Sequence, residues 1–461
     1  MHNYPLTACC LRRVASMVFL CFATILSISA QSSPTKYHFK EFKLPEINRR
    51  ALDIKPNLSG ALIRNLLSGK DLLSSSSKIT QNIGLQYSYF HNSKRKQIFH
   101  NLYIGQSYNA INQLSDFHSS FNPRINRQFG SNLYHSAVNR YYFTSRHFSE
   151  INWDVQGSFF DRRTLTSAAS LLTQTNTYFY SISVPLKTGI GRVEPVQDVF
   201  SAAFMAEDML QVGILDSPME QEELFELGRV MADARNLRIF DARKKRMYEL
   251  SQLDNWFKDI GKAKVDNILY YNTMADNWLF AFSGVRYSGR RISTSVTPGF
   301  QYFGNEGNAP NTRLSFSGAF LLEQFLPLSR TWQLDYSINV GISRNFVSVD
   351  VYSEYRFFTP FMAAQLELGC FPNSRTSIHF NARVAGEFYG AYPSILQTFA
   401  SFHASGNIFL NYRTRLYADV HWDYYRTSDN AIYQHPRAFL PQAGLRNIDY
   451  GANIRLIYSL F

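Results

Sequence analysis

The chain has 461 residues, of which 28 are Tyr, 38 Phe and 5 Trp, so that aromatic residues make up 15% of it. Charged residues make up only 18%, with a formal net charge of +12. The aromatic content excludes a disordered chain, and 4 Cys are too few for a disulfide-stapled scaffold. Beyond the first 30 residues no apolar run approaches the roughly 20 residues that a transmembrane helix needs, which excludes a helical membrane protein.

Residues 1–30 have the pattern of a secretory signal peptide. Arg12 and Arg13 precede an apolar run over 14–26, and Ala30 is a small residue suited to cleavage. An uncleaved membrane anchor is the alternative, although the run is short for a membrane span. Cleavage would leave Cys370 as the one cysteine of the exported chain, so we expect no internal disulfide.

The next segment, 31–79, is polar and contains four consecutive serines at 74–77. Its composition predicts a periplasmic tether or partial plug, with a disordered segment as the alternative, and 58–73 could form one short amphipathic helix.

Apolar and polar residues alternate with a period of two over 80–191 and again over 263–461. A clear case is the series Leu334, Tyr336, Ile338, Val340 and Ile342, which alternates with polar residues and glycine. Such strands present one face to an apolar medium and the other to a polar one. A soluble β-sandwich would alternate too, but these segments are about 10–14 residues long, against five or six for typical soluble strands.

Two further features favour a membrane barrel over a sandwich. Aromatic residues recur near the strand ends, as in the girdles of outer-membrane barrels, and charges lie in mid-strand on the polar face. We therefore predict an all-β transmembrane barrel of about 14–16 antiparallel strands in a bacterial outer membrane. The expected strands lie near 80–91, 97–109, 113–122, 131–144, 147–160 and 174–186, then near 276–287, 291–303, 312–326, 330–342, 345–358, 361–371, 375–388, 397–411, 412–426 and 446–461.

Residues 192–262 break this period. Val196, Val199, Phe200 and Ala203 follow helical spacing, and two further amphipathic segments follow. Ser217 is the expected N-cap of the second helix. Because six strands precede the segment, parity predicts a small three-helix insertion on the periplasmic side. It could be a plug that packs on the barrel mouth, or a docking platform for a periplasmic or outer-membrane protein.

Four adjacent cations, Arg243, Lys244, Lys245 and Arg246, lie in the third expected helix. They are candidates for partner docking. A solvated helix face is the plainer interpretation, and contact with anionic phosphates of the inner leaflet is a third.

The run Gly189-Ile190-Gly191-Arg192-Val193-Glu194-Pro195, together with Phe240-Asp241-Ala242-Arg243, resembles a motif pair of uncharacterised outer-membrane barrels of Bacteroidota. The resemblance covers the insertion and extends to the barrel only through its architecture. It implies a barrel with a periplasmic helical insertion and implies no activity. The chain ends in Phe461, which is similar to the terminal signal that the barrel-assembly machinery reads, although the apolar phase here falls on Leu460.

Candidate lumen-lining residues are the charged residues and histidines of the polar strand face. No serine stands out beside the histidines as a nucleophile, no motif of metal ligands occurs, and the basic residues form no stripe. We therefore expect no catalytic site, no metal, no cofactor and no nucleic-acid partner. The lumen candidates are Asp335, Asp350, Glu354, His379, Arg383, Glu387, Arg415, Asp419, His421, Asp423 and Arg455.

These features predict an integral outer-membrane channel or transporter whose polar lumen is partly closed by the helical insertion. The alternative is a non-transporting scaffold, or an accessory subunit of an assembly or secretion complex, that docks partners through the insertion. The expected partners are outer-membrane lipid and, during biogenesis, the barrel-assembly machinery.

Overall fold

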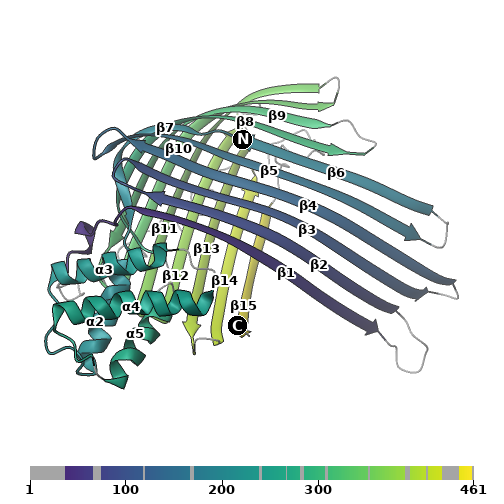
Figure 1. The fold of residues 1–461 in the computed structure, drawn as a ribbon. Helices are drawn as coiled ribbons and strands as arrows, with labels where there is room; N and C mark the ends of the chain where they lie inside the picture. The colour runs from purple at the N-terminus through teal and green to yellow at the C-terminus, as the bar shows by residue number, and fades with distance from the viewer. Residues whose placement is uncertain are drawn as a thin grey trace, which may run out of the picture.

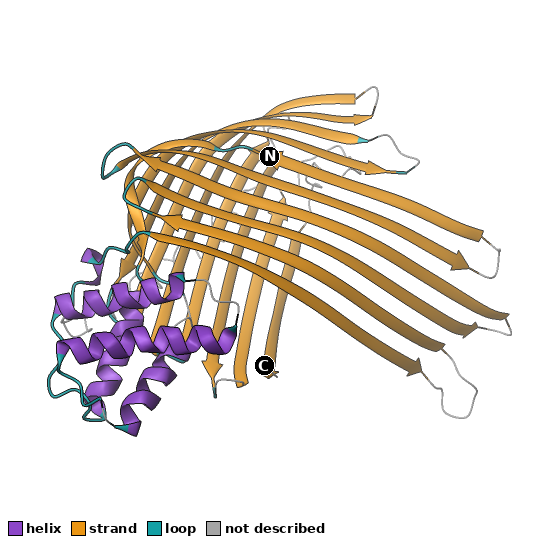
Figure 2. Ribbon diagram, in the orientation of Figure 1, coloured by secondary structure: helices purple, strands orange, loops and turns teal. Residues whose placement is uncertain are grey.

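A large curved antiparallel sheet carries the described α-helices at one of its ends (Figure 2). The computed structural model describes residues 37–65, 74–117, 120–166, 171–237, 241–265, 267–280, 285–306, 310–350, 353–389, 395–411, 414–427 and 446–458. The predicted signal peptide and Phe461 lie outside the described residues. None of the described helices is long and apolar enough to cross a membrane.

The strands follow one another around the sheet in chain order, and every pairing between them is antiparallel (Figure 1). The strands are β1 (Ile47–Asn65), β2 (Ser74–Asn92), β3 (Lys96–Phe117), β4 (Ser120–Tyr142), β5 (His147–Thr166), β6 (Leu171–Ser183), β7 (Leu186–Pro195), β8 (Tyr287–Asn305), β9 (Asn311–Pro327), β10 (Trp332–Asp350), β11 (Ser353–Asn373), β12 (Thr376–Tyr389), β13 (Ile395–Phe409), β14 (Thr414–Thr427) and β15 (Arg446–Tyr458).

Strands β6 and β7 share one position in the sheet. Both pair with β5 and with β8 in a single continuous register, and only Val184 and Pro185 interrupt them. Proline has no N–H to donate to the ladder, which explains the interruption. The 15 named strands therefore occupy fourteen positions, because two of them share one. This confirms the predicted antiparallel sheet at the lower end of the expected strand number.

The prediction of a tether or partial plug over 31–79 is wrong for 47–65 and 74–79, which belong to β1 and β2. Residues 47–65 form β1, which pairs with β2 along its whole length, and Leu58 lies in that strand instead of in a helix. The alternation of Leu52, Ile54 and Leu58 was hidden by Pro56 and Gly60, residues that usually mark turns.

Three other strand predictions are corrected. Segment 113–122 spans the connection between β3 and β4, and the first part of 276–287 belongs to a helix. The break expected between the strands 330–342 and 345–358 does not exist, because β10 continues through it and Asn345 is buried within that strand. The number of strand positions before the insertion nevertheless remains six, since the missed β1 compensates for the false strand at 113–122 and β6 and β7 share one position.

The two ends of the sheet differ in their connections. At the helical end the strands are joined by short turns, such as Ser374–Arg375, whereas β14 and β15 are joined at the other end through 428–445. Outer-membrane barrels have short periplasmic turns and longer external loops. The helices thus lie at the end with short turns.

The helical unit contains α2 (Gln197–Gln211), α3 (Gln221–Asn236), α4 (Ala242–Ile260) and α5 (Ile268–Phe280). It has four helices instead of the predicted three, and it continues past 262 to Phe280. Helix α3 begins with a capping box between Glu220 and Glu223, three residues after the predicted cap at Ser217.

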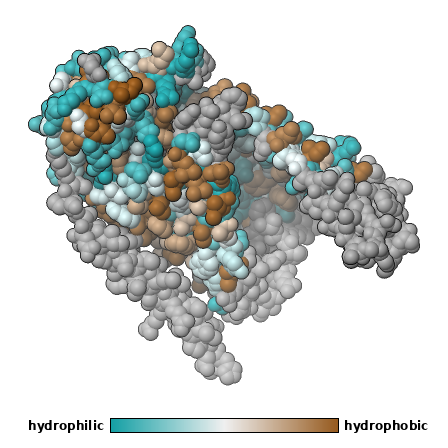
Figure 3. Space-filling view, turned by 90° about the horizontal axis from the view of Figure 1, so that it is seen from below, coloured by the Kyte–Doolittle hydropathy of each residue, from teal (hydrophilic) through white to brown (hydrophobic). Residues whose placement is uncertain are grey.

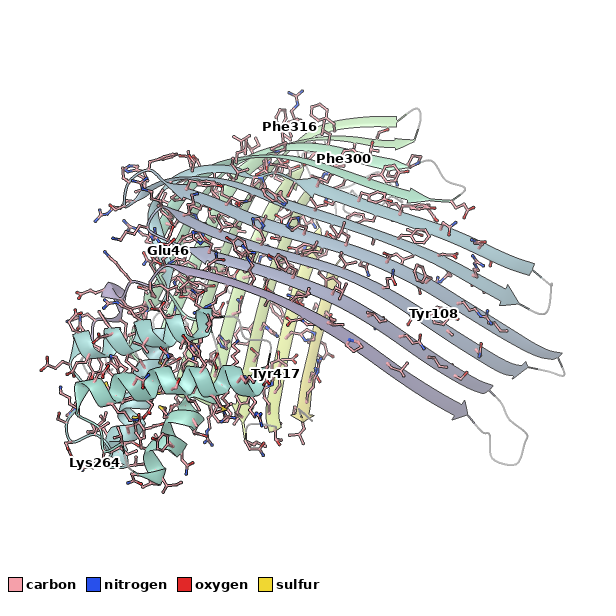
Figure 4. The ribbon with its side chains drawn as sticks, in the orientation of Figure 1. Glu46, Tyr108, Lys264, Phe300, Phe316 and Tyr417 are labelled. Carbon is pink, nitrogen blue, oxygen red and sulfur yellow. The ribbon has the colours of Figure 1, made fainter. Side chains whose placement is uncertain are left out.

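The helical unit has a hydrophobic core of its own, which includes Phe200, Leu224 and Phe257. Residues 37–44, which contain the 3-10 helix η1 (Phe39–Glu41), complete this core with Phe39 and Phe42. The unit is therefore built from two segments distant in sequence. In Figure 4, Glu46 lies where the chain passes from the helical unit into β1.

The two faces of the sheet differ in chemistry. One face carries exposed apolar residues such as Val296, Phe316 and Val420, and Figure 4 shows Phe300 and Phe316 on the convex side. We call this the outer face and the opposite, mainly polar face the inner face. Seen from below, hydrophobic residues gather in a patch beside the more hydrophilic helical unit (Figure 3).

Candidate functional site at the helical end of the sheet

Three arginines from the sheet side dock the helical unit through phenylalanine rings. The guanidinium carbon of Arg286 lies 3.4 Å from the ring centroid of Phe200, that of Arg330 lies 4.9 Å from Phe204, and that of Arg375 lies 4.8 Å from Phe280. Arg330 also pairs with Glu207, and Arg375 with Asp276. Cations over aromatic faces are attracted by the ring quadrupole, so these contacts hold the unit on the turns.

Arg286, just before β8, is the most deeply buried of the three, with 1% of its surface exposed. It donates hydrogen bonds to the backbone oxygens of Ser329 (2.9 Å), Arg330 and Trp332 (3.2 Å) and to Oε1 of Gln333 (3.3 Å). Burial lowers the pKa of Arg286 to about 9, and nearby Asp335 opposes this shift. The side chain joins the β9–β10 turn to the helical unit.

A buried ion pair connects two helices within the helical unit. Arg235 of α3 is paired with Asp198 in the first turn of α2, and both side chains are almost fully buried. Burial lowers the pKa of Arg235, while the Asp198 carboxylate raises it. Arg49 of β1 lies 3.8 Å from the same carboxylate and donates to the backbone oxygen of Ala232 at 3.1 Å.

A buried network on the inner face of the sheet lies beside this junction. Arg140 donates from Nε to Glu150 at 2.6 Å and from Nη1 to Gln97 at 2.9 Å, and Tyr142 donates to the same Gln97 oxygen. Lys187 lies 3.1 Å from Glu150. We call these five residues the basal network. Their hydrogen bonds compensate for burying charge, which is otherwise costly.

The glycine–arginine motif lies in β7 at the edge of the basal network. Gly191 has φ 109°, a conformation that favours glycine, and Arg192 donates to the backbone oxygens of Ser93 and Lys94. Arg192 also pairs with Glu194. In the other half of the motif pair, Asp241 caps α4 by accepting from the backbone N–H groups of Arg243 and Lys244. The motif residues that the structure describes thus have structural roles at the junction.

Replacing Gly191 with alanine is expected to destabilise the junction. A Cβ atom there would lie 2.0 Å from the backbone oxygen of Arg290, and the positive φ would strain any L side chain. We expect a loss of about 2–3 kcal/mol in unfolding free energy, measured as a lower urea midpoint in detergent. The control is Gly406→Ala, because no atom lies within 4 Å of a Cβ at that position. Equal midpoints for the two variants would contradict the expected strain.

The register places nine of the eleven predicted lumen residues on the inner face. His379 contacts Glu367 of the neighbouring strand at 3.1 Å, and the ring of His421 lies where a Cβ of Gly451 would be. The predictions for Asp350 and Glu354 stay predictions, because the side chains of these two residues lie outside the described part of the structure. The nine are Asp335, His379, Arg383, Glu387, Arg415, Asp419, His421, Asp423 and Arg455.

Charge is unevenly distributed over the described inner face. On β1–β9 the cations Arg49, Lys55, Lys78, Arg140, Arg162, Lys187, Arg291 and Arg313 outnumber the anions Asp53, Glu150, Asp154 and Glu323. On β10–β15 the anions Asp335, Glu367, Glu387, Asp419, Asp423 and Asp449 outnumber Arg383, Arg415 and Arg455. One wall is therefore mainly basic and the other mainly acidic.

The basic quartet lies at the start of α4. Arg243, Lys244 and Arg246 are exposed, and Lys245 lies 3.8 Å from Glu249. Cations near a helix N-terminus are unfavourable for the helix dipole, so helix stability does not explain them.

Sequence reasoning missed the basal network and the three docking arginines. A signal was present in part, because Arg330 and Arg375 both occur in short turns at the helical end. Which carboxylates and rings they contact depends on the position of the helical unit, which no local pattern reveals. Among the residues that the structure describes, no three His, Cys, Asp or Glu side chains lie close enough together to hold a metal ion.

No family model and no curated protein matches the chain. Among solved structures, it is distantly similar to the alcaligin outer-membrane receptor FauA of Bordetella pertussis, at 7% identity and a TM-score of 0.31, over 91% of this chain and 60% of the receptor. The chain thus spans about 60% of that receptor's length. It is also similar to the β-domain of the Bordetella autotransporter BrkA (8% identity, TM-score 0.24, over 90% of this chain and 100% of that one) and to the transport unit of the Escherichia coli autotransporter AIDA-I (8%, 0.24, 95% and 97%). These are distant likenesses to outer-membrane β-barrels and assign no family.

Proposed function

We propose that the chain is an integral β-barrel of a bacterial outer membrane that conducts solutes through a polar lumen, with the helical unit partly closing its periplasmic end. The observation that carries the proposal is the sheet itself, with an apolar outer face and a charged inner face over fourteen strand positions. A barrel of this size encloses more space than its own side chains fill. We propose no catalytic role. Membership of a Bacteroidota-type family remains part of this proposal.

The proposal requires that the sheet close on itself. In the described residues β1 pairs only with β2, and β15 only with β14. In lipid each free backbone N–H or C=O costs several kcal/mol, so an open edge is not viable there. Strands β1 and β15 run in opposite directions because the number of positions is even, which allows them to close the sheet in an antiparallel pairing.

The conductance of the purified chain in planar bilayers tests the proposed function. We expect single-channel steps, and we expect the double variant Asp419→Lys/Asp423→Lys to shift the reversal potential in a KCl gradient toward anion selectivity, because both residues lie on the acidic inner wall. The control is Asp216→Lys, which changes an exposed carboxylate of the helical unit.

A deletion separates the channel from the scaffold alternative. Pro195 and Tyr287 are register partners, so residues 197–285 can be replaced by a short turn between β7 and β8. A larger conductance in this variant would support partial closure by the helical unit. Silent bilayers for both proteins would contradict the channel and favour a scaffold that docks partners through the exposed cations of α4.

A further inference from the structure

A cavity of about 500 Å³ lies between the inner face of the sheet and the start of α2. Its walls are mainly apolar and come from separate segments, including Leu44 of the N-terminal segment, Phe99 and Val138 of the sheet, and Phe325 of β9. This volume lies in the range of small-molecule sites, which typically combine apolar walls with a few convergent polar groups.

The polar groups of this cavity are unusual because three of them are arginines. Arg49, Arg140 and Arg291 reach it from β1, β4 and β8, and Asp198 is the one carboxylate in its lining. Arg291 donates from Nε to Glu323 at 2.6 Å, and Arg140 is held by the basal network. The Nε of Arg49 is buried without a hydrogen-bond partner in the described part of the chain.

The charges around the cavity do not balance. The lining itself holds three cations, Arg49, Arg140 and Arg291, against one anion, Asp198, and the carboxylates that pair with Arg140 and Arg291 lie outside the lining. The cavity also lies at the N-terminal end of α2, where the helix dipole favours negative charge. A bound anion would lie against these arginines and offset the positive charge of the lining.

We propose that the cavity binds an amphipathic monoanion, a medium-length aliphatic carboxylate, with its head group at the arginines and its chain among Phe99, Val138 and Phe325. This inference deepens the proposed function, because the site lies within the proposed conduction path and names a class of solute for it. An uncharged or cationic amphiphile would leave the positive excess uncompensated.

Titration calorimetry on the full chain in nanodiscs, with empty discs subtracted, tests the proposal. Decanoate is the probe, and decan-1-ol and decyltrimethylammonium are its uncharged and cationic counterparts. We expect saturable binding of decanoate at a Kd at least about tenfold below that of decanol, which corresponds to about 1.4 kcal/mol, and no binding of the cation. Equal affinity for decanoate and decanol would overturn the assignment of the arginines.

Substitutions locate the site. Arg49→Gln and Arg291→Gln are each expected to raise the decanoate Kd about tenfold, whereas Arg313→Gln, an inner-face arginine held by Asn345 outside the cavity, leaves it unchanged. Val138→Trp fills the cavity and should abolish binding, with heat-modifiable gel migration as the check on folding. Undiminished binding to a folded Val138→Trp variant would overturn the location. Loss of decanoate binding with intact conductance would contradict the ligand alone, and silent bilayers would contradict the proposed function instead.

Discussion

Cysteines introduced at positions 53 and 455 are expected to form an intramolecular disulfide almost completely in the membrane-inserted protein. The expectation follows from the register of the whole sheet. We follow the register partners from strand to strand, starting at Ile47 at the helical end of β1. This series of partners reaches Thr427 at the far end of β14. The ends of the sheet are therefore strongly staggered, as barrel closure requires.

Placing Asp53 of β1 opposite Arg455 of β15 gives this stagger a physically reasonable value. Following the register once around the closed barrel then shifts the position along the strands by about 16 residues, or ~53 Å. The circumference consists of fourteen strands spaced ~4.8 Å apart. The resulting strand tilt is about 38°, within the range of membrane barrels. The same register pairs Ile54 with Ile454 on the outer face. A shift of this register by two residues would place Arg455 opposite Lys55, which has a like charge, or opposite Ala51, which has no charge.

The cross-link is measured as a shift in gel migration after mild oxidation, in a Cys370→Ser background that removes the native thiol. The control pair is Asp53→Cys with Asp449→Cys, because position 449 lies on the same face six residues away from the expected partner and is beyond disulfide reach. Cross-linking of positions 51 and 455 in place of 53 and 455 would show that the register is wrong. No cross-link at any of these pairs would show that β1 and β15 do not close the sheet.

Replacing Arg286 with methionine is expected to release the helical unit from the sheet. The variant removes the Arg286 donor from the carbonyl oxygens of Ser329, Arg330 and Trp332, of which Trp332 keeps two backbone donors, and it removes the cation between the rings of Phe200 and Phe371. A hydrogen bond to a charged group contributes about 1.5–3 kcal/mol, so we expect the loss of these contacts to cost a few kcal/mol. Arg286→Lys should recover little, because an ammonium group cannot reproduce the planar stack and the forked hydrogen bonds.

Limited proteolysis measures this release, since cleavage within 197–280 should accelerate while heat-modifiable migration of the barrel persists. Arg290→Met is the matched control, because Arg290 is an exposed arginine four residues further along the chain. Unchanged proteolysis of Arg286→Met would mean that the other two arginine–phenylalanine contacts suffice to hold the unit.

The sequence by itself determined the long antiparallel strands, their faces and the helical character of the insertion. Each depends on local periodicity, and a period of two assigned Asp419, His421 and Asp423 to one face without knowledge of their neighbours. The local pattern failed in β1, where proline and glycine interrupt the alternation. It also failed in α5, an apolar helix that has only a weak amphipathic pattern.

Only the tertiary structure decided how the helical unit sits on the sheet and which charges meet there. Arg286 and Phe371 are 85 positions apart, and Arg49 and Ala232 meet across 183. Such contacts follow from the packing of a core that joins residues 37–44 to the insertion, and the free energy of that packing is shared among distant segments. The excess of positive charge around the cavity is likewise a property of strands brought together, because no stretch of the sequence contains it.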